Sequence, residues 1–250
     1  MTTDQASARH SPLHQVHLEL GASFTDFAGW QMPVRYSSDL LEHHAVRTAA
    51  AIFDLSHMAE IRASGTEAAA FLDYALAGIL SAIAVGQAKY SLILSEQGGI
   101  IDDVIVYRTA ENSFLIVANA GNHDAVLAAL NERAERFSVA IHDESYDTAL
   151  IAVQGPQALS VMLATAGIRM TEPLTSLRYY WSLAAEYAGE NLLIARTGYT
   201  GEDGFELYLP VQQAGRLWQE LMASGNHYGL IPAGLAARDT LRLEAGMPLY

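Results

Sequence analysis

The sequence contains no cysteine. This absence excludes a disulfide scaffold, a thiolate nucleophile, cysteine-ligated zinc and an iron–sulfur cluster. The Gly-x-Ser-x-Gly motif of serine hydrolases and the His-Glu-x-x-His motif of zinc proteases are also missing. His43 and His44 would diverge around an expected helix, and together with His57 they are better interpreted as solvated or capping side chains than as metal ligands. We therefore expect no metal site.

Long apolar runs and basic residues are scarce as well. No run reaches the length of a membrane-spanning helix, and Met1–His10 lacks the apolar core of a secretory signal. The chain has 14 Lys and Arg against 28 Asp and Glu, which gives a formal net charge of −14. This charge repels phosphate backbones, and an anionic ligand would require a local arginine. We expect a cytoplasmic protein whose partners include neither nucleic acid nor a membrane.

The remaining composition is that of a globular protein. Of the 250 residues, 51% are hydrophobic and 17% are charged, and the length suits one large domain or two intertwined smaller ones. Phe53–Met58 is expected to be a loop or an edge strand. Strands and helices are grouped in a way that predicts an α+β fold with mixed or antiparallel sheets packed by helices. Three strands joined by short turns should form an antiparallel meander: Tyr90–Leu94, Ile100–Tyr107 and Phe114–Asn119.

Two adjacent carboxylates, Asp102 and Asp103, interrupt the middle strand of this meander. Neighbouring side chains of a strand point to opposite faces, so the two acids cannot serve the same site. At least one of them then lies among apolar neighbours, where an unpaired charge costs several kcal/mol. The alternative is that the strand ends early and both acids are solvated. In the strand, Asp103 would share its face with Ile101, Ile105 and Tyr107, and Asp102 with Ile100, Val104 and Val106.

A third carboxylate, Glu206, lies in a strand with apolar residues on both sides. The alternation alone favours a solvent-facing side chain. The functional alternative is a carboxylate that accepts two N–H groups from a flat heterocycle. The segment before it contains Gly198, Gly201 and Gly204, but it joins two strands, whereas a dinucleotide-binding loop opens a helix. We expect a turn shaped around a ligand, or a wide hairpin.

Arg238 is the candidate anion-binding residue. Arg238 and Arg242 lie four residues apart on an expected helix, and Asp239 can pair with Arg242. Arg238 is then left either in water or in contact with an anion. The spacing does not decide between the two.

Taken together, these segments resemble the T-protein of the glycine cleavage system, a tetrahydrofolate-dependent aminomethyltransferase. Any one segment would be weak, but they occur in the family's order along essentially the whole chain. The matching segments are Phe27–Pro33, Ala45–Thr48, Phe53–Met58, Gly99–Asp103, Gly198–Glu206 and Gly234–Asp239.

The resemblance implies a fold and a domain organisation. We expect the folate-binding aminomethyltransferase fold, with residues 1–56 and 145–250 forming a discontinuous first α+β domain. Residues 57–144 would form an inserted ferredoxin-like α+β domain. The family continues past Pro248 into a further β-rich domain, which we expect this chain to lack together with an arginine that helps to build the family's site.

The resemblance also implies a site. On the motif matches, Asp103 is similar to the family's catalytic aspartate, and Glu206 to the carboxylate that holds the aminopyrimidine edge of the pterin. The remaining folate-lining positions of similar proteins fall on Met58, Tyr90, Ile105, Tyr107, Asn119, Tyr179, Tyr199 and Arg238.

The implied reaction starts from an aminomethyl group on the lipoyl arm of a carrier protein, the lipoylated H-protein. Ammonia leaves, and the one-carbon unit passes to N5 and N10 of tetrahydrofolate. No covalent bond to the enzyme is needed, and Asp103 would orient the folate nitrogens and stabilise a cationic, iminium-like centre.

Two alternatives remain open at this point. Another folate-dependent member of the superfamily, such as a demethylase, would share these motifs. The flavin-containing fusion enzymes lack support because no flavin-binding fingerprint is present, and the iron–sulfur-assembly relatives carry a cysteine that this chain lacks. The second alternative is a non-catalytic module that binds folate or docks a carrier protein.

Overall fold

A computed structural model describes residues 8–249 of the chain. Residues 1–7, which form most of the Met1–His10 segment considered for a secretory signal, and Tyr250 lie outside the described residues. The strands occur in short runs separated by helices, and they form mixed or antiparallel sheets against which the helices pack, so the predicted α+β class is confirmed. The helices are α1 (His14–Glu19), α2 (Asp39–Thr48), α3 (Ala68–Ala75), α4 (His123–Ala134), α5 (Ala158–Ala164), α6 (Val211–Gly225) and α7 (Leu235–Glu244), with short 3₁₀ turns at Ala120–Asn122, Leu174–Ser176 and Asn226–Tyr228.

The larger sheet has seven strands in the order β11-β12-β13-β14-β10-β4-β15. Its neighbours are antiparallel except for β15 and β4, which run parallel. Its strands are β4 (Ala50–Asp54), β10 (Thr148–Gln154), β11 (Ile168–Met170), β12 (Ser182–Tyr187), β13 (Glu190–Ala195), β14 (Gly204–Pro210) and β15 (Leu230–Pro232). Beside this sheet lies a small one in the order β1-β3-β2, built from β1 (Arg9–His10), β2 (Ser23–Phe27) and β3 (Trp30–Arg35).

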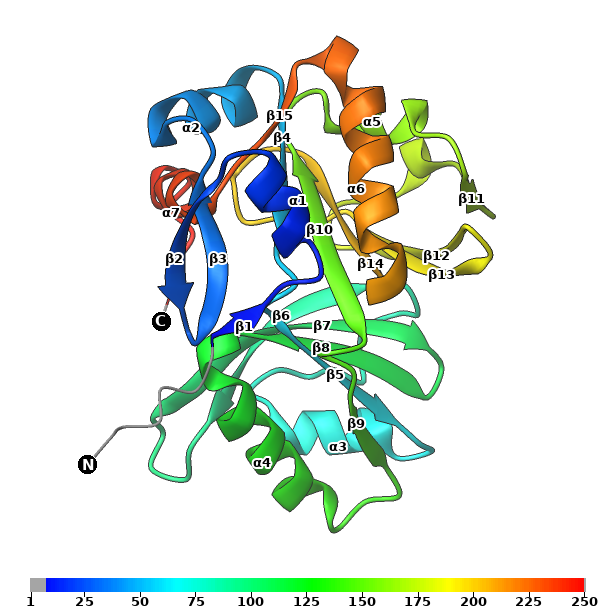
Figure 1. The fold of residues 1–250 in the computed structure, drawn as a ribbon. Coiled ribbons are helices and arrows are strands. Elements are labelled where there is room, and N and C mark those ends of the chain that lie inside the picture. The colour runs from blue at the N-terminus through cyan, green and yellow to red at the C-terminus, as the bar shows by residue number, and fades with distance from the viewer. Residues whose placement is uncertain (1–7, 250) are drawn as a thin grey trace, which may run out of the picture.

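A five-stranded antiparallel sheet lies below the larger one in Figure 1, with α3 and α4 on its outer face. Its order is β6-β7-β8-β5-β9, so the expected meander β6-β7-β8 is confirmed. All its strands come from one continuous stretch of chain, whereas the seven-stranded sheet takes strands from both sides of that stretch. The domain boundaries at 56/57 and 144/145 stay a prediction. The strands are β5 (Ala59–Ser64), β6 (Ala88–Leu94), β7 (Ile100–Ala110), β8 (Ser113–Ala118) and β9 (Ala140–Asp143).

The two faces of the seven-stranded sheet belong to different cores. One face packs against α5 and α6 through residues such as Ile151, Phe205 and Trp218. The opposite face packs against α2 and α7 and also against the five-stranded sheet, which contributes Leu115 and Val117. Alternate residues of one strand therefore enter two separate apolar cores. The second core, between the two sheets, is the region that holds the cavity described below.

Two expectations about strands are wrong. The edge-strand alternative is wrong for Phe53 and Asp54, which end β4, because β4 is paired on both sides, by β10 and by β15, and is buried throughout. The loop alternative is right for residues 55–58, which connect β4 to β5. The strict alternation around the two aspartates fails at Ile101. The pairing of β6 with β7 shifts there, from Ile93 opposite Asp102 to Leu94 opposite Ile100. This β-bulge turns Ile101 toward the core that contains α3 and α4, and not toward the face of Asp103.

Glu60 on β5 is a buried carboxyl group in the region between the two sheets. Its side chain is 0% exposed, and neither carboxyl oxygen has a hydrogen-bond partner among the described residues. Burial raises the pKa of Glu60 well above its usual value, and the nearby carboxylates of Asp143, Glu144 and Glu206 act in the same direction. Burial therefore favours the neutral form of Glu60 in the folded protein.

This protonation predicts a pH-dependent stability. Above a pH of about 4.5 the unfolded chain releases the Glu60 proton while the folded protein keeps it, so the unfolding free energy falls as pH rises through that window. Glu60→Gln removes this titration. We expect its unfolding free energy relative to wild type to rise by up to about 1.4 kcal/mol per pH unit above pH 4.5. Urea unfolding at several pH values measures it, with exposed Glu190→Gln as the matched control. Parallel pH profiles for Glu60→Gln and wild type would contradict the assignment.

Candidate functional site

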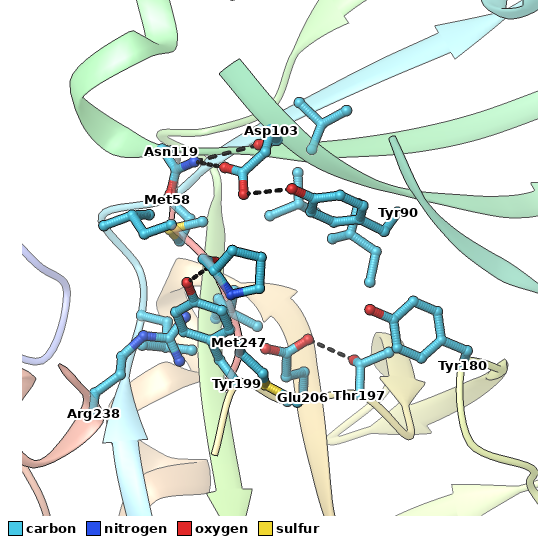
Figure 2. Close-up of a pocket in the computed structure, with 18 of the residues that line it drawn as sticks. Met58, Tyr90, Asp103, Asn119, Tyr180, Thr197, Tyr199, Glu206, Arg238 and Met247 are labelled. Atoms are coloured by element: carbon cyan, nitrogen blue, oxygen red, sulfur yellow. Dashed lines mark hydrogen bonds between the residues drawn. The ribbon is translucent and has the colours of Figure 1, made fainter. Parts of the chain in front are cut away.

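A cavity of about 400 Å³ lies between the two sheets. This volume is within the range of small-molecule sites. Figure 2 shows Asp103 and Asn119 on one side of it and Glu206 and Thr197 on the opposite side. Side chains from both sheets, from α7 and from the segment after α7 line it: Leu55, Met58, Tyr90, Asp103, Val104, Ile105, Val117, Asn119, Leu150, Tyr180, Thr197, Gly198, Tyr199, Glu206, Tyr208, Arg238, Met247, Pro248 and Leu249.

Asp103 projects from β7 into this cavity with both carboxylate oxygens anchored. Oδ2 accepts a hydrogen bond from the Tyr90 hydroxyl on β6, at 3.0 Å. Oδ1 accepts one from the Asn119 side-chain amide, at 2.5 Å. Burial, followed by the hydrogen bond to Asp103, raises the pKa of Tyr90 to about 12, so its hydroxyl remains a donor at neutral pH. The carboxylate is thus held in one orientation with a negative charge facing the cavity.

Asp102 points to the other face of β7, as the strand pattern predicts. It is 0% exposed and accepts hydrogen bonds from the backbone N–H of Asn119 and from the side-chain amides of Asn119 and Asn122, each at 2.8 Å. Burial raises the pKa of Asp102, and these three hydrogen bonds act against that rise. The expectation that one acid lies among apolar neighbours is confirmed. The buried charge is satisfied by amide donors.

Glu206 projects from β14 into the cavity from the seven-stranded sheet. Its Oε2 atom accepts hydrogen bonds from the hydroxyls of Thr197 at 2.5 Å, Tyr107 at 3.2 Å and Tyr208 at 3.4 Å. Among the described residues the hydrogen bonds of this carboxylate all go to Oε2, which leaves Oε1 available to a ligand. The solvent-facing interpretation is wrong: Glu206 is 8% exposed because the second sheet covers its face.

The tyrosine hydroxyls around Glu206 stay protonated and can donate hydrogen bonds to it. Burial, and after it the Glu206 charge, raises the pKa of both Tyr107 and Tyr208 well above the usual value. Both therefore stay protonated, and the single Tyr208 proton is shared between the Tyr107 hydroxyl at 3.1 Å and Glu206 Oε2 at 3.4 Å. Tyr107 belongs to the five-stranded sheet and Tyr208 to the seven-stranded one, so this group of hydroxyls connects the two sheets.

The glycine-containing loop between β13 and β14 is shaped by a buried glutamine. The Gln154 amide donates to the Thr197 carbonyl at 3.0 Å and accepts from the Thr200 hydroxyl at 2.8 Å. A Cβ atom at Gly198 would lie 2.0 Å from this side chain, and one at Gly204 would lie 2.3 Å from it. These two glycines are therefore needed for the loop to pack on Gln154, which fixes the Thr197 position beside Glu206.

Arg238 on α7 supplies the positive charge at the cavity. Its guanidinium carbon lies 5.1 Å from the centre of the Tyr199 ring, and the pair stands at the same wall in Figure 2. Asp239 pairs with Arg242 at 2.7 Å, as expected, and within residues 8–249 Arg238 has no carboxylate partner in an ion pair. Burial lowers the pKa of Arg238, and the nearby Glu206 opposes the shift. This guanidinium is available to an anionic part of a ligand.

The structure brings together most, but not all, of the expected site residues. Met58, Tyr90, Asp103, Ile105, Asn119, Tyr199, Glu206 and Arg238 line the cavity. Tyr107 does not line it, because it is fully buried behind Glu206. Tyr179 does not line it either, since its side chain is 54% exposed, and its neighbour Tyr180 takes the position instead. Tyr180 has a φ of +62°, in the left-handed region, so the backbone departs from an extended strand at this residue.

Several lining residues were absent from the sequence-based set. Thr197 and Tyr208 could have been found once Glu206 was assigned inward, since Tyr208 is two residues away on the same strand face. Met247, Pro248 and Leu249 carry no local signal of this kind. The Tyr199 hydroxyl donates to the Pro248 carbonyl, which holds this segment against the cavity.

The histidines form no site. His57 is 4% exposed, so the expectation that it is solvated or capping is wrong, and burial lowers its pKa to about 4. His43 contacts Thr240 and Glu244 at the surface of α7. In the described part of the chain no group of three or more histidine or acidic side chains is arranged to hold a metal ion. No helix among the same residues has the length and apolar character needed to cross a bilayer.

Fold and site together define an α+β protein with a small-molecule cavity between two sheets and a carboxylate on each side of it. The profile of the GCVT N-terminal domain family matches residues 13–250, and the chain belongs to this family. The resemblance inferred from the motifs is thereby confirmed.

Known relatives agree with this assignment. The chain is 57% identical over 246 residues to the aminomethyltransferase of Cutibacterium acnes, covering 97% of this chain and 66% of that protein. It is 54% identical over 245 residues to the aminomethyltransferase of Saccharopolyspora erythraea, covering 98% and 66%. The crystal structure of the glycine cleavage system aminomethyltransferase T from Bartonella henselae aligns with a TM-score of 0.89 at 40% identity, covering 97% of this chain and 64% of that one. The chain thus spans slightly less than two thirds of the length of these relatives.

Proposed function

We propose that this chain carries the folate site and the catalytic aspartate of a glycine-cleavage aminomethyltransferase. In this reaction the one-carbon unit moves from the aminomethyl-lipoyl arm of a carrier protein to tetrahydrofolate, and ammonia is released. The observation that carries the proposal is the opposition of Asp103 and Glu206, from different sheets, across one cavity. One carboxylate can hold a ring while the other faces the atoms that react.

Glu206 supports the binding half of the proposal. The aminopyrimidine edge of a pterin presents adjacent N–H donors, which a carboxylate accepts strongly. Because Oε2 already accepts the hydroxyl hydrogens of Thr197 and Tyr107, and shares that of Tyr208 with the Tyr107 oxygen, Oε1 is the principal acceptor for the ring. The aromatic rings of Tyr180 and Tyr199 form part of the cavity wall. Arg238 also lines the cavity, and its positive charge can bind the acidic tail of folate, which the net negative charge of the chain would otherwise repel.

Asp103 supports the catalytic half. Its fixed negative charge stabilises positive charge that develops on the one-carbon unit as ammonia leaves, and its anchored oxygens orient the accepting nitrogens. Ile105, on the same face of β7, and Val117 of the neighbouring strand β8 line the same cavity with apolar surface, which limits the access of water to the reacting atoms. Positioning and electrostatics then provide the acceleration without a protein nucleophile.

The remaining parts of the proposal follow from the family. The names of the relatives support an aminomethyl donor, and a lipoylated H-protein in the cytoplasm is the donor that the motif resemblance implies. The 14% identical sarcosine oxidase chain from Corynebacterium sp. U-96, with a TM-score of 0.59, shares the fold and does not support a demethylase over an aminomethyltransferase.

A two-part assay tests the proposal. We expect tetrahydrofolate to bind the chain in isothermal titration calorimetry and ammonia to be released when aminomethyl-loaded lipoyl carrier is added. Binding without ammonia release would favour a non-catalytic folate-binding module. Failure to bind tetrahydrofolate, with the chain folded by circular dichroism, would reject the folate site itself.

A further inference from the structure

We propose that Asp102 is a positioning residue that holds the Asp103 carboxylate in place through the side-chain amide of Asn119. The expected effect on turnover rests on the proposed function. The hydrogen-bonded connection from Asp102 through Asn119 to Asp103 does not depend on that function. Asp102 itself lies on the face of β7 opposite to the cavity and does not line it.

Three N–H groups converge on Asp102. Oδ2 accepts the backbone N–H of Asn119, and Oδ1 accepts the side-chain amides of Asn119 and Asn122. A side chain that satisfies all three must be an acceptor at both ends, and among residues of this size only an ionised aspartate is. An asparagine at this position would place its own NH₂ group against one of these donors in either orientation.

This arrangement fixes which end of the Asn119 amide faces Asp103. The nitrogen Nδ2 must point toward Asp102, since Asp102 only accepts. The second proton of the same nitrogen is then directed at Asp103 Oδ1, 2.5 Å away. If the amide turned over, its carbonyl oxygen would face the Asp103 carboxylate and repel it.

The position of Asn119 in the fold makes the amide a rigid connection. It directly follows β8, whose last residue Ala118 pairs with Val104 of β7, and it precedes the 3₁₀ turn Ala120–Asn122. The two bonds from Asn119 to Asp102 therefore join the end of β8 to the strand that carries both aspartates. A fully buried carboxylate is expensive unless hydrogen-bonded, and this connection supplies the reason for its presence.

A double-mutant cycle tests the connection in turnover. We expect Asp102→Asn to lower kcat by about 10–100-fold, the effect of losing one charge-assisted hydrogen bond, with the Kd for tetrahydrofolate changed less than about threefold. In an Asn119→Ala background the same change should lower kcat by less than about threefold, because the connection is already cut. Asn122→Ala is the matched control, since it removes a side-chain donor to Asp102 and leaves in place the side-chain bonds from Asn119 to Asp102 and Asp103.

The possible outcomes separate positioning from general stabilisation. An unchanged kcat for Asp102→Asn, or the same fold-loss with and without Asn119, would overturn the proposal. Parallel losses of melting temperature, folate binding and kcat would also overturn it, because they describe a structural role alone.

A second measurement uses the unmodified chain without folate or carrier, so it remains decisive if the proposed function fails or a variant does not fold. NMR exchange of side-chain amide protons compares Asn119 with Asn191, which is exposed. We expect the Asn119 protons to exchange at least about tenfold more slowly, because both are bonded to carboxylates. Equal exchange rates would reject the connection, whatever the enzyme does.

Discussion

Asp103→Asn should lower the turnover of tetrahydrofolate-dependent ammonia release by about 10²–10⁴-fold, while tetrahydrofolate binding largely survives. The substitution keeps the shape of the side chain and removes the negative charge that faces the cavity from β7. It also places an amide against one of the two donors, Tyr90 or Asn119, that now orient the carboxylate. Single-turnover ammonia release and calorimetry on the same preparation separate the two effects.

Tyr90→Phe is the matched comparison for that experiment. It removes one donor to Asp103 and keeps the charge, so the expected loss is about tenfold in kcat, from one hydrogen bond. Unchanged turnover in Asp103→Asn would remove this residue from the mechanism. A collapse of folate binding equal to the loss of turnover would instead make Asp103 a binding residue.

Glu206→Gln should weaken tetrahydrofolate binding by about 3 kcal/mol, which is roughly 10²-fold in Kd. The carboxylate provides an unoccupied acceptor, Oε1, opposite the reacting end of the cavity. Glutamine replaces one acceptor with an NH₂ group, which would face either the ring donors or the hydroxyls of Thr197 and Tyr107. Calorimetric titration with tetrahydrofolate measures the change directly.

Tyr208→Phe controls for disturbance of the hydroxyl group around Glu206. Its bond to Oε2 is the longest of the three, 3.4 Å, so we expect the Kd to rise less than about fivefold. Wild-type affinity in Glu206→Gln would show that the ring is held elsewhere. Equal losses in the two variants would point to loss of packing and not of the carboxylate acceptor.

The sequence predicted the parts of the site that depend on local geometry. The period of two in a strand correctly placed Asp102 and Asp103 on opposite faces, and the apolar flanks correctly predicted that one acid is buried. The same rule failed at Ile101, where a β-bulge adds one residue to β7. The sequence does not predict that bulge, because isoleucine at position 101 is equally compatible with a regular strand.

The errors at Glu206 and in β4 have a tertiary cause. An acidic residue that alternates with apolar residues in a strand normally lies at the surface. Glu206 is enclosed because the five-stranded sheet, which is distant in sequence, packs against its face of the seven-stranded sheet. β4 gains a parallel neighbour, β15, from near the other end of the chain, which no local pattern could supply. The motif resemblance does not depend on this local pattern. It therefore assigned Glu206 to the ligand site although the alternation favoured a solvent-facing side chain.

The exchange of Tyr179 for Tyr180 has a conformational cause. The two rings are adjacent and chemically identical, and they lie outside any regular strand, so no period decides between them. Tyr180 also has a positive φ, a backbone conformation that strand alternation does not anticipate. The residue-by-residue transfer from the family therefore named the neighbouring ring in this segment.

The Tyr107 hydroxyl extends from the sheet that carries Asp103 to the carboxylate of Glu206 on the other sheet. The separation between the Glu206 and Asp103 carboxylates is therefore set by how the two sheets stack, and not by either loop alone. A ligand must match that fixed length from its donor edge to its reactive nitrogens. Under the proposed function, folate analogues with a longer or shorter bridge would place N10 at a different distance from Asp103, even where their rings, and with them N5, are the same.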